Sequence, residues 1–159
     1  MVNAQIQELT KRIQSLEDER NILQTLHRYC HTIELGLEKE WVDCFTKDGS
    51  LLIHWRKGSG SPIIGHEELA KFIAHHSRAP LRYHKHLYSV PMMKISDNLA
   101  SVTGYVVRID EDNGIPAIWS FGRYHDQMVK SSDATWRIQN RRLEIDSAHH
   151  NNPINKDLP

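Results

Sequence analysis

The chain has 159 residues, of which 39% are hydrophobic and 25% charged, as expected for one globular domain with a single core. Its 20 basic and 20 acidic residues cancel, and no block of like charge stands out, which argues against nucleic acid or an anionic membrane as the main partner. The sequence also has no membrane-length apolar run, no signal-peptide pattern and only two cysteines, Cys30 and Cys44, outside any CxxC motif, and together these predict a cytoplasmic protein with reduced thiols.

The first half of the chain is predicted to be mainly helical. Apolar residues recur at steps of three and four from Ile6 to Leu16 and again from Ile22 to Ile33, with a polar stretch between the two sets. This predicts two consecutive helices or one bent helix that ends near Gly36, with residues 1–20 as a helical extension. The first apolar set is heptad-like and fits packing either on its own domain or on a partner subunit. Further along, we predict a helix over 38–45, a turn at Asp48-Gly49, a strand over 50–55, a flexible loop over 58–62 and a helix over 66–75.

After Pro80 the pattern changes to strands that follow one another without helices. Strands in such a series pair antiparallel, and helices followed by a sheet form an α+β domain. A curved antiparallel sheet on about three N-terminal helices leaves one pocket between the two layers. The predicted strands are 83–95, 99–109, 118–129 and 135–146; residues 148–159 form a polar tail of this single domain, 1–159.

Five short motifs in the same order resemble the SnoaL-like branch of the NTF2-like superfamily. This branch includes polyketide cyclases, scytalone dehydratase and bile acid 7α-dehydratase. The resemblance implies a cone-shaped fold, a pocket for a small hydrophobic molecule, and a homodimer formed through the open sheet face. The motifs are LHRYCHTIELGL (26–37), WVDCFTKDGSL (41–51), IGHEELAKF (64–72), RYHKH (82–86) and GRYHDQMVKSSDATWRIQNRR (122–142).

The same resemblance implies the catalytic residues. Glu34 matches a carboxylate that orients a histidine base, and His86 matches that base, with His84 as the weaker candidate. Family members usually carry Asp at the position of Glu34. Tyr29 matches a pocket tyrosine that assists a departing hydroxyl, and Asp110 lies near an acidic position. The structural alternatives are a solvated Glu34, a buried core His86, a core Tyr29 and an Asp110 that belongs to a turn.

The remaining histidines and aromatic residues have weaker signals. His27, His31 and Glu34 share a helix face with acceptable metal-ligand spacing, although such faces are usually only solvated, and no metal is expected. The adjacent pairs His75-His76 and His149-His150 are predicted to lie on the surface. Some of the strand aromatics are expected to line the cavity and bind a flat or alicyclic ligand, while the others belong to the core: Trp55, Tyr83, Tyr105, Trp119 and Phe121.

These features favour a cofactor-free lyase, dehydratase-like, or an isomerase that abstracts a proton with His86. The sequence contains no GxGxxG, P-loop, GxSxG or CxxC motif, so nucleotide cofactors and serine or cysteine hydrolysis have little support. One alternative is a non-catalytic ligand-binding or scaffold domain, such as the small subunit of a ring-hydroxylating dioxygenase. Another is a cyclase or isomerase that uses an acidic residue without the histidine.

Overall fold

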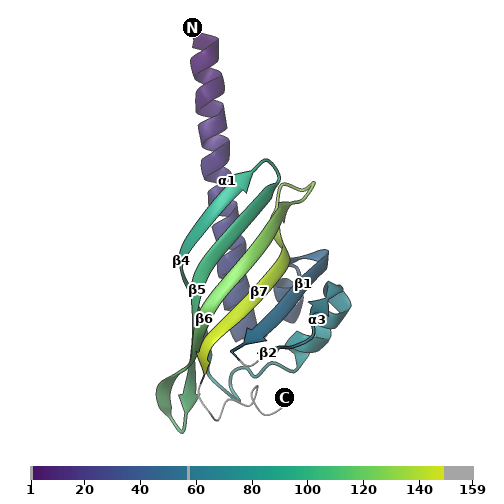
Figure 1. Cartoon of the computed structure of the whole chain (residues 1–159), viewed down its shortest axis with the longest axis vertical. Helices are drawn as coiled ribbons and strands as arrows, with labels where there is room; N and C mark the ends of the chain where they lie inside the picture. The colour runs from purple at the N-terminus through teal and green to yellow at the C-terminus, as the bar shows by residue number, and fades with distance from the viewer. Residues whose placement is uncertain (1, 57, 149–159) are drawn as a thin grey trace.

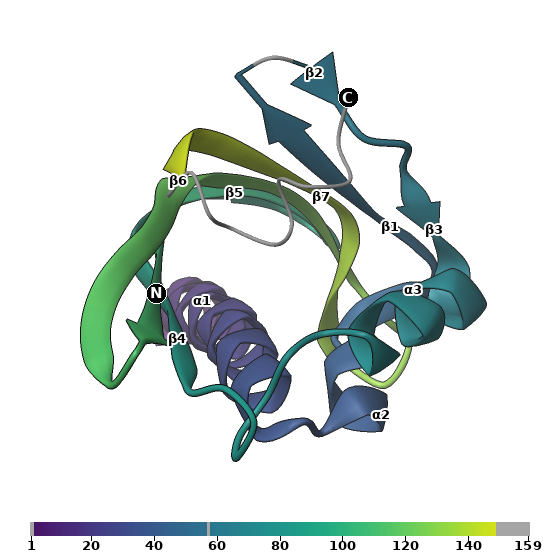
Figure 2. The ribbon, with the colours of Figure 1, turned by 90° about the horizontal axis from the view of Figure 1, so that it is seen from below.

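Three helices and seven strands make up the fold in a computed structural model that describes residues 2–56 and 58–148 (Figure 1). The long first helix runs along the concave side of the sheet and projects beyond it. The short helices lie together on one side of the domain (Figure 2). The elements are α1 (Val2–Leu35), α2 (Glu38–Val42), β1 (Phe45–Trp55), β2 (Gly58–Ser59), β3 (Ile63–Ile64), α3 (Gly65–Ala74), β4 (His84–Ser96), β5 (Leu99–Asp112), β6 (Ile115–Lys130) and β7 (Trp136–Ala148).

Helix α1 is continuous through the polar stretch that separates its two apolar sets. Within that stretch Asp18 is buried, accepts a hydrogen bond from Trp136 Nε1 at 2.8 Å, and pairs with Lys130 Nζ at 2.7 Å. Burial raises the pKa of Asp18, but hydrogen bonds from Lys130, Trp136 and Gln14 outweigh it, so the pKa is lowered. The polar stretch therefore attaches the helix to the hairpin of β6 and β7. The helix ends as predicted at Gly36, whose φ of 69° suits glycine.

The sheet is mixed, with the order β2-β1-β7-β6-β5-β4. Strands β4 to β7 pair antiparallel as predicted, but β1 pairs parallel with β7, which corrects the expectation of a wholly antiparallel sheet. The prediction holds for strands joined by hairpins; β1 precedes β7 by a long stretch of chain that includes α3, so no hairpin fixes its direction.

Two loop predictions also need correction. Asp48 and Gly49 form no turn between a helix and a strand, because β1 already begins at Phe45 and includes them. The register of β1 against β7 shifts between Phe45 and Ser50, so the turn residues sit in an irregular part of the strand. Likewise, the predicted loop over 58–62 contains the two-residue strand β2, which pairs with the end of β1. The predicted polar tail and the pair His149-His150 lie outside the described residues, apart from Ala148 at the end of β7.

The final hairpin contains a buried ion pair that packs against two aromatic rings. Arg141 donates two hydrogen bonds of 2.7 Å to the carboxylate of Asp126, and its guanidinium carbon lies 4.1 Å from the Tyr29 ring centroid and 4.0 Å from that of Tyr124. A buried charge needs such partners. Asp126 and Arg141 thus hold Tyr29 of α1 against the sheet and support one wall of the interior.

The main core fills the space between the sheet and the three helices. Its largest members include Trp41, Phe45 and Trp136, each with no measurable exposure. Among the described residues, no helix is both long and apolar enough to cross a membrane.

Candidate functional site

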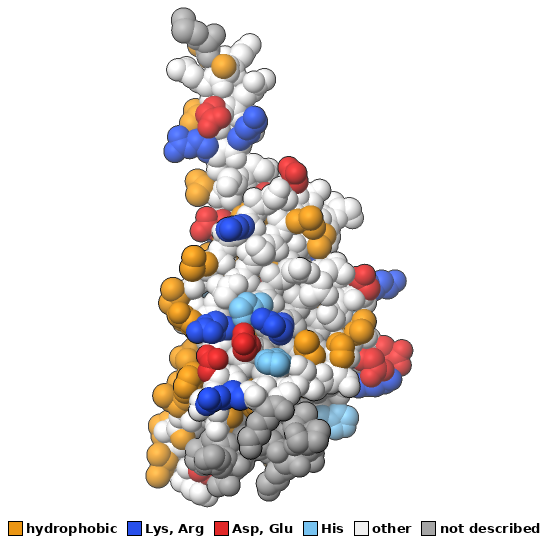
Figure 3. All heavy atoms as spheres, viewed as in Figure 1, with side chains coloured by type: hydrophobic (Ala, Val, Ile, Leu, Met, Phe, Trp, Pro, Cys, Tyr) orange, Lys and Arg blue, Asp and Glu red, His pale blue; other side chains and the backbone are white. Residues whose placement is uncertain are grey.

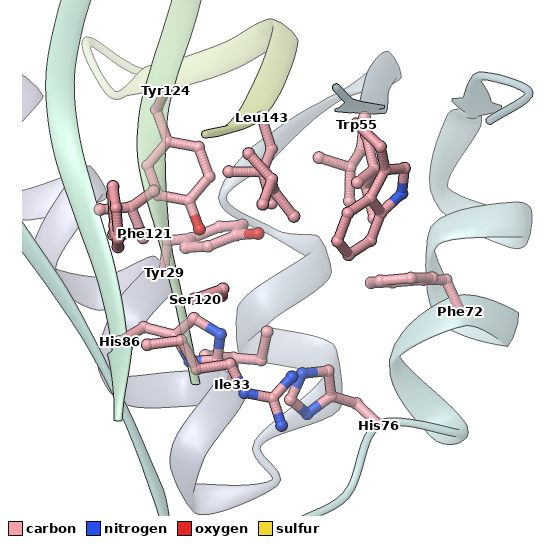
Figure 4. Close-up of a pocket in the computed structure, with 15 residues that line it drawn as sticks. Tyr29, Ile33, Trp55, Phe72, His76, His86, Ser120, Phe121, Tyr124 and Leu143 are labelled. Carbon is pink, nitrogen blue, oxygen red and sulfur yellow. The ribbon is translucent and has the colours of Figure 1, made fainter. Parts of the chain in front are cut away.

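A cavity lies between the concave face of the sheet and helices α1 and α3 (Figure 4). Its volume of about 60 Å³ is well below the range of pockets for drug-sized ligands, so it suits a compact molecule. Most of the lining is apolar or aromatic. The polar groups come from Tyr29, His76, His86, Arg108, Ser120 and Tyr124.

His86 lines this cavity, but the predicted contact between its imidazole and Glu34 is not formed. The Glu34 carboxylate accepts a hydrogen bond from the backbone N–H of His86 at 2.8 Å and pairs with Lys85 Nζ at 3.0 Å. Glu34 therefore fixes the start of β4 rather than the imidazole, and it is not the solvated residue of the alternative interpretation, since its side chain is 10% exposed. The Nδ1 atom of His86 is buried without a hydrogen-bond partner among the described residues.

His76, predicted to lie on the surface, lines the cavity opposite His86 (Figure 4). Their ring centroids are 5.6 Å apart, and His84 stands beside both, at 4.9 Å from His76 and 5.1 Å from His86. His76 Nδ1 lies 2.9 Å from the carbonyl oxygen of Ser77. Because a carbonyl only accepts, Nδ1 carries the proton, and the Nε2 atom of the neutral ring has a free lone pair. Only its neighbour His75 is exposed as predicted.

The imidazoles are held in the neutral form. Burial lowers the pKa of His76 to about 4, with further contributions from Arg108 and His84. Burial, followed by the charges of Arg108, His76 and His84, also brings the pKa of His86 well below its usual value. Both rings are therefore available as proton acceptors at neutral pH.

Arg108 brings a fixed positive charge to the same cavity. Its guanidinium donates to both carboxylate oxygens of Asp110, at 2.6 and 2.8 Å, and Arg82 Nε also lies 2.9 Å from Asp110. Asp110 is 1% exposed and belongs to β5, so it is not a turn residue. It is not among the residues that line the cavity, and it acts by orienting Arg108.

Sequence reasoning missed both His76 and Arg108. Arg108 and Asp110 are two residues apart on a strand and therefore share a face, which could have indicated their pairing. His76 follows Leu69, Phe72 and Ile73 at helical spacing, so in the sequence it continues the pattern of the buried face of α3, although the helix ends at Ala74. The adjacent histidine His75 made this periodicity of His76 less apparent in the sequence.

The predicted aromatic lining is present in part. Trp55 and Phe121 line the cavity, whereas Tyr83, Tyr105 and Trp119 do not. Tyr105 is 51% exposed, because it alternates on β5 with Val106, which faces the cavity. Tyr83 precedes β4 and is 57% exposed, and buried Trp119 lies under the guanidinium of Arg82 at 4.5 Å. The core residue Tyr29 also reaches the cavity, so its two interpretations are compatible.

The rival constellation on α1 does not converge. His27 and His31 are exposed, while Glu34 turns toward Lys85. Across residues 2–56 and 58–148, no group of three or more His, Cys, Asp or Glu side chains has an arrangement that could hold a metal ion.

Comparisons with known proteins agree on the fold. A sequence model of the SnoaL-like domain matches residues 14–142. No curated protein sequence matches the chain. Among solved structures, a protein of unknown function from Mycobacterium tuberculosis is 26% identical, with a TM-score of 0.74 over 84% of this chain and 74% of that one. Two proteins from Novosphingobium aromaticivorans share the fold. An NTF2-like protein with a cystatin-like fold is 15% identical, with a TM-score of 0.75 over 89% of this chain and 90% of that one. A candidate scytalone dehydratase is 20% identical, with a TM-score of 0.71 over 87% of this chain and 91% of that one.

Proposed function

Because the chain belongs to the SnoaL-like domain family, whose fold supports many activities, we propose a function from the site itself: a cofactor-free lyase or isomerase. It would move a proton on a small, apolar, cyclic compound. The observation that carries the proposal is the convergence of two neutral imidazoles and one guanidinium in a cavity that is otherwise mainly apolar.

His86 is the proposed base. Its ring faces the cavity, and its lowered pKa leaves it unprotonated at neutral pH. It would remove a proton from a carbon next to a carbonyl group, which forms an imidazolium beside His76. The free Nε2 lone pair of His76 can accept a hydrogen bond from that imidazolium after a small movement, since the rings are 5.6 Å apart. The neighbour would therefore stabilise the charge that proton abstraction creates.

Arg108 is the proposed partner of the negative charge. Removing a proton next to a carbonyl puts charge on the carbonyl oxygen, and an oriented cation in an apolar site stabilises this charge strongly. Asp110, which also pairs with Arg82, holds the guanidinium in place before the substrate binds. Preorganisation of this kind lowers the barrier because little rearrangement is needed during the reaction.

The fate of the proton separates the two reaction types. In an elimination, the imidazolium of His86 returns the proton to a departing hydroxyl, which leaves as water, and Tyr29 can hydrogen-bond that hydroxyl. In an isomerisation, the same proton returns to a different carbon. Neither route uses Glu34 as a partner of the imidazole; its proposed part is to position His86 through the backbone.

A panel of small cyclic β-hydroxy ketones tests the proposal, with formation of the conjugated enone followed by ultraviolet absorbance. His86→Ala should lower turnover by about 100-fold or more, as expected for loss of a general base. His75→Ala is the matched control, because His75 is an exposed histidine directly after α3 that does not line the cavity. If the compounds bind but neither wild type nor His75→Ala turns any of them over, the binding or scaffold alternative is the better account.

A further inference from the structure

The projecting part of α1 carries a stripe of exposed apolar side chains. The stripe consists of Val2, Ile6, Leu9, Ile13 and Leu16, and each of these side chains is 54% to 67% exposed. Figure 1 shows this part of the helix beyond the end of the sheet, and Figure 3 shows hydrophobic side chains along it, with basic and acidic ones between them. Five large apolar side chains at regular spacing on an exposed helix indicate a surface that is covered by a partner.

The spacing identifies the kind of partner. The steps of four, three, four and three residues are those of a heptad repeat, with Ile6 and Ile13 at a positions and Leu9 and Leu16 at d positions. Isoleucine at a with leucine at d favours a parallel two-stranded coiled coil. We propose that the stripe is the seam of a parallel coiled coil with α1 of a second copy of this chain.

The charges beside the seam support this alignment. In a parallel pair, a g residue faces the e residue five positions later on the partner helix. Arg12 is at g and Glu17 is at e, so Arg12 of each copy faces Glu17 of the other. An antiparallel pair that places Leu9 against Ile13 would instead bring the two Arg12 side chains together. Both charges are exposed and free to make the predicted contact.

The position of the domain on the helix also permits the contact. Successive residues turn by about 100° around a helix, which puts the stripe on roughly the opposite side from Ile22, Leu26 and Tyr29. Those residues are among the ones that α1 buries against its own domain. The two domain bodies would thus lie on the outer sides of the coil. The next a position is Arg20, which is exposed and would face Arg20 of the second copy, so the seam ends there.

Cysteine cross-linking of the full chain tests the alignment directly. In the parallel pair, Leu9 lies against Leu9 of the second copy, so Leu9→Cys should give a cross-linked dimer under mild oxidation. Lys11→Cys is the matched control, since position f points away from the seam. Its cross-linked yield should remain low. The native Cys30 and Cys44 are buried. Equal yields from the two variants, or no cross-link from Leu9→Cys, would overturn the proposal.

A charge exchange tests the same contact without a cysteine. Arg12→Glu and Glu17→Arg should each raise the dissociation constant measured by sedimentation equilibrium by roughly threefold or more, because each places like charges together. The double variant restores opposite charges and should return toward the wild-type value. A double variant as weak as the single ones, or single variants with an unchanged dissociation constant, would contradict the parallel pairing.

Discussion

At the residue scale, the chemistry depends on side chains whose environment the sequence shows only in part. His86 and Tyr29 were identified from their places in the family motifs, and both line the cavity. The partner assigned to His86 was wrong: Glu34 binds a backbone N–H, and the groups around the imidazole are His76, His84 and Arg108. Which residues of separate elements meet depends on sheet curvature and helix placement, which a local motif does not determine.

The pH dependence of turnover follows from the lowered pKa of His86. Its usual value is about 6.5, and burial together with Arg108 moves it well below that. The base is therefore already unprotonated above pH 6.5, and kcat/KM should stay level from pH 6.5 to 8 and fall only at more acidic pH. A steady-state pH profile measures this. A rise centred near pH 7 would show that a different group, or an imidazole paired with a carboxylate, acts as the base.

Arg108→Lys tests the role of the guanidinium while it keeps the charge. A lysine cannot reproduce the two-pronged contact with Asp110, so its ammonium should be poorly placed against the developing oxyanion. We expect kcat to fall by about 100-fold with a smaller change in KM. Circular dichroism verifies the fold. A rise in KM with an unchanged kcat would assign Arg108 to binding of the ground state instead.

At the element scale, the sequence predicted most helices and the antiparallel run of strands, because these depend on local periodicity and short turns. It did not predict the parallel pairing of β1 with β7, which is decided by how distant segments cover the core. For α1 it left two alternatives open, two consecutive helices or one bent helix, and the structure has one helix. The polar stretch suggested a break, but Asp18 there is satisfied by Trp136 and Lys130 from the last hairpin.

Asp18→Asn should therefore destabilise the domain by about 1–3 kcal/mol at pH 7, because it removes a buried charge-assisted contact to Lys130. The pKa of Asp18 is lowered in the folded chain, so its contribution is complete above the unfolded value of 3.8 and is lost as the pH falls further. Urea unfolding at pH 7 and pH 3 should show the difference between variant and wild type shrinking at the lower pH. The exposed neighbour variant Glu19→Gln should stay within about 0.5 kcal/mol at pH 7.

Gly122→Ala tests the close approach of β6 and β7. A Cβ atom at this position would lie 1.9 Å from the carbonyl oxygen of Glu144, and backbone cannot move aside as a side chain can. We expect a loss of about 3 kcal/mol or more in the free energy of unfolding. At Gly104 the nearest atoms belong to the Tyr88 side chain, at 2.6 Å, so Gly104→Ala should cost less. A loss at Gly122 no larger than a small loss at Gly104 would mean that β6 and β7 move apart at Gly122 at little cost.

At the scale of the whole molecule, the cavity and the coiled-coil seam are separate features of one chain. All residues that line the cavity come from a single copy and lie beyond the projecting part of α1. Arg12→Glu should therefore weaken self-association while kcat/KM stays within about twofold of wild type, a change too small to reflect loss of a catalytic group. A large loss of activity on dissociation would mean that the second copy contributes to the site. Association through the open sheet face, implied by the family resemblance, stays a separate prediction.

The most direct test of the central claim is proton abstraction itself, measured without any requirement for a leaving group. Small cyclic ketones incubated with the protein in deuterated buffer should exchange the hydrogens next to their carbonyl, and proton NMR follows the loss of those signals. The account predicts exchange well above the buffer rate for wild type and His75→Ala, and a rate reduced by about 100-fold or to background for His86→Ala. Exchange at the buffer rate with wild type across ketones shown to bind, or undiminished exchange with His86→Ala, would contradict it.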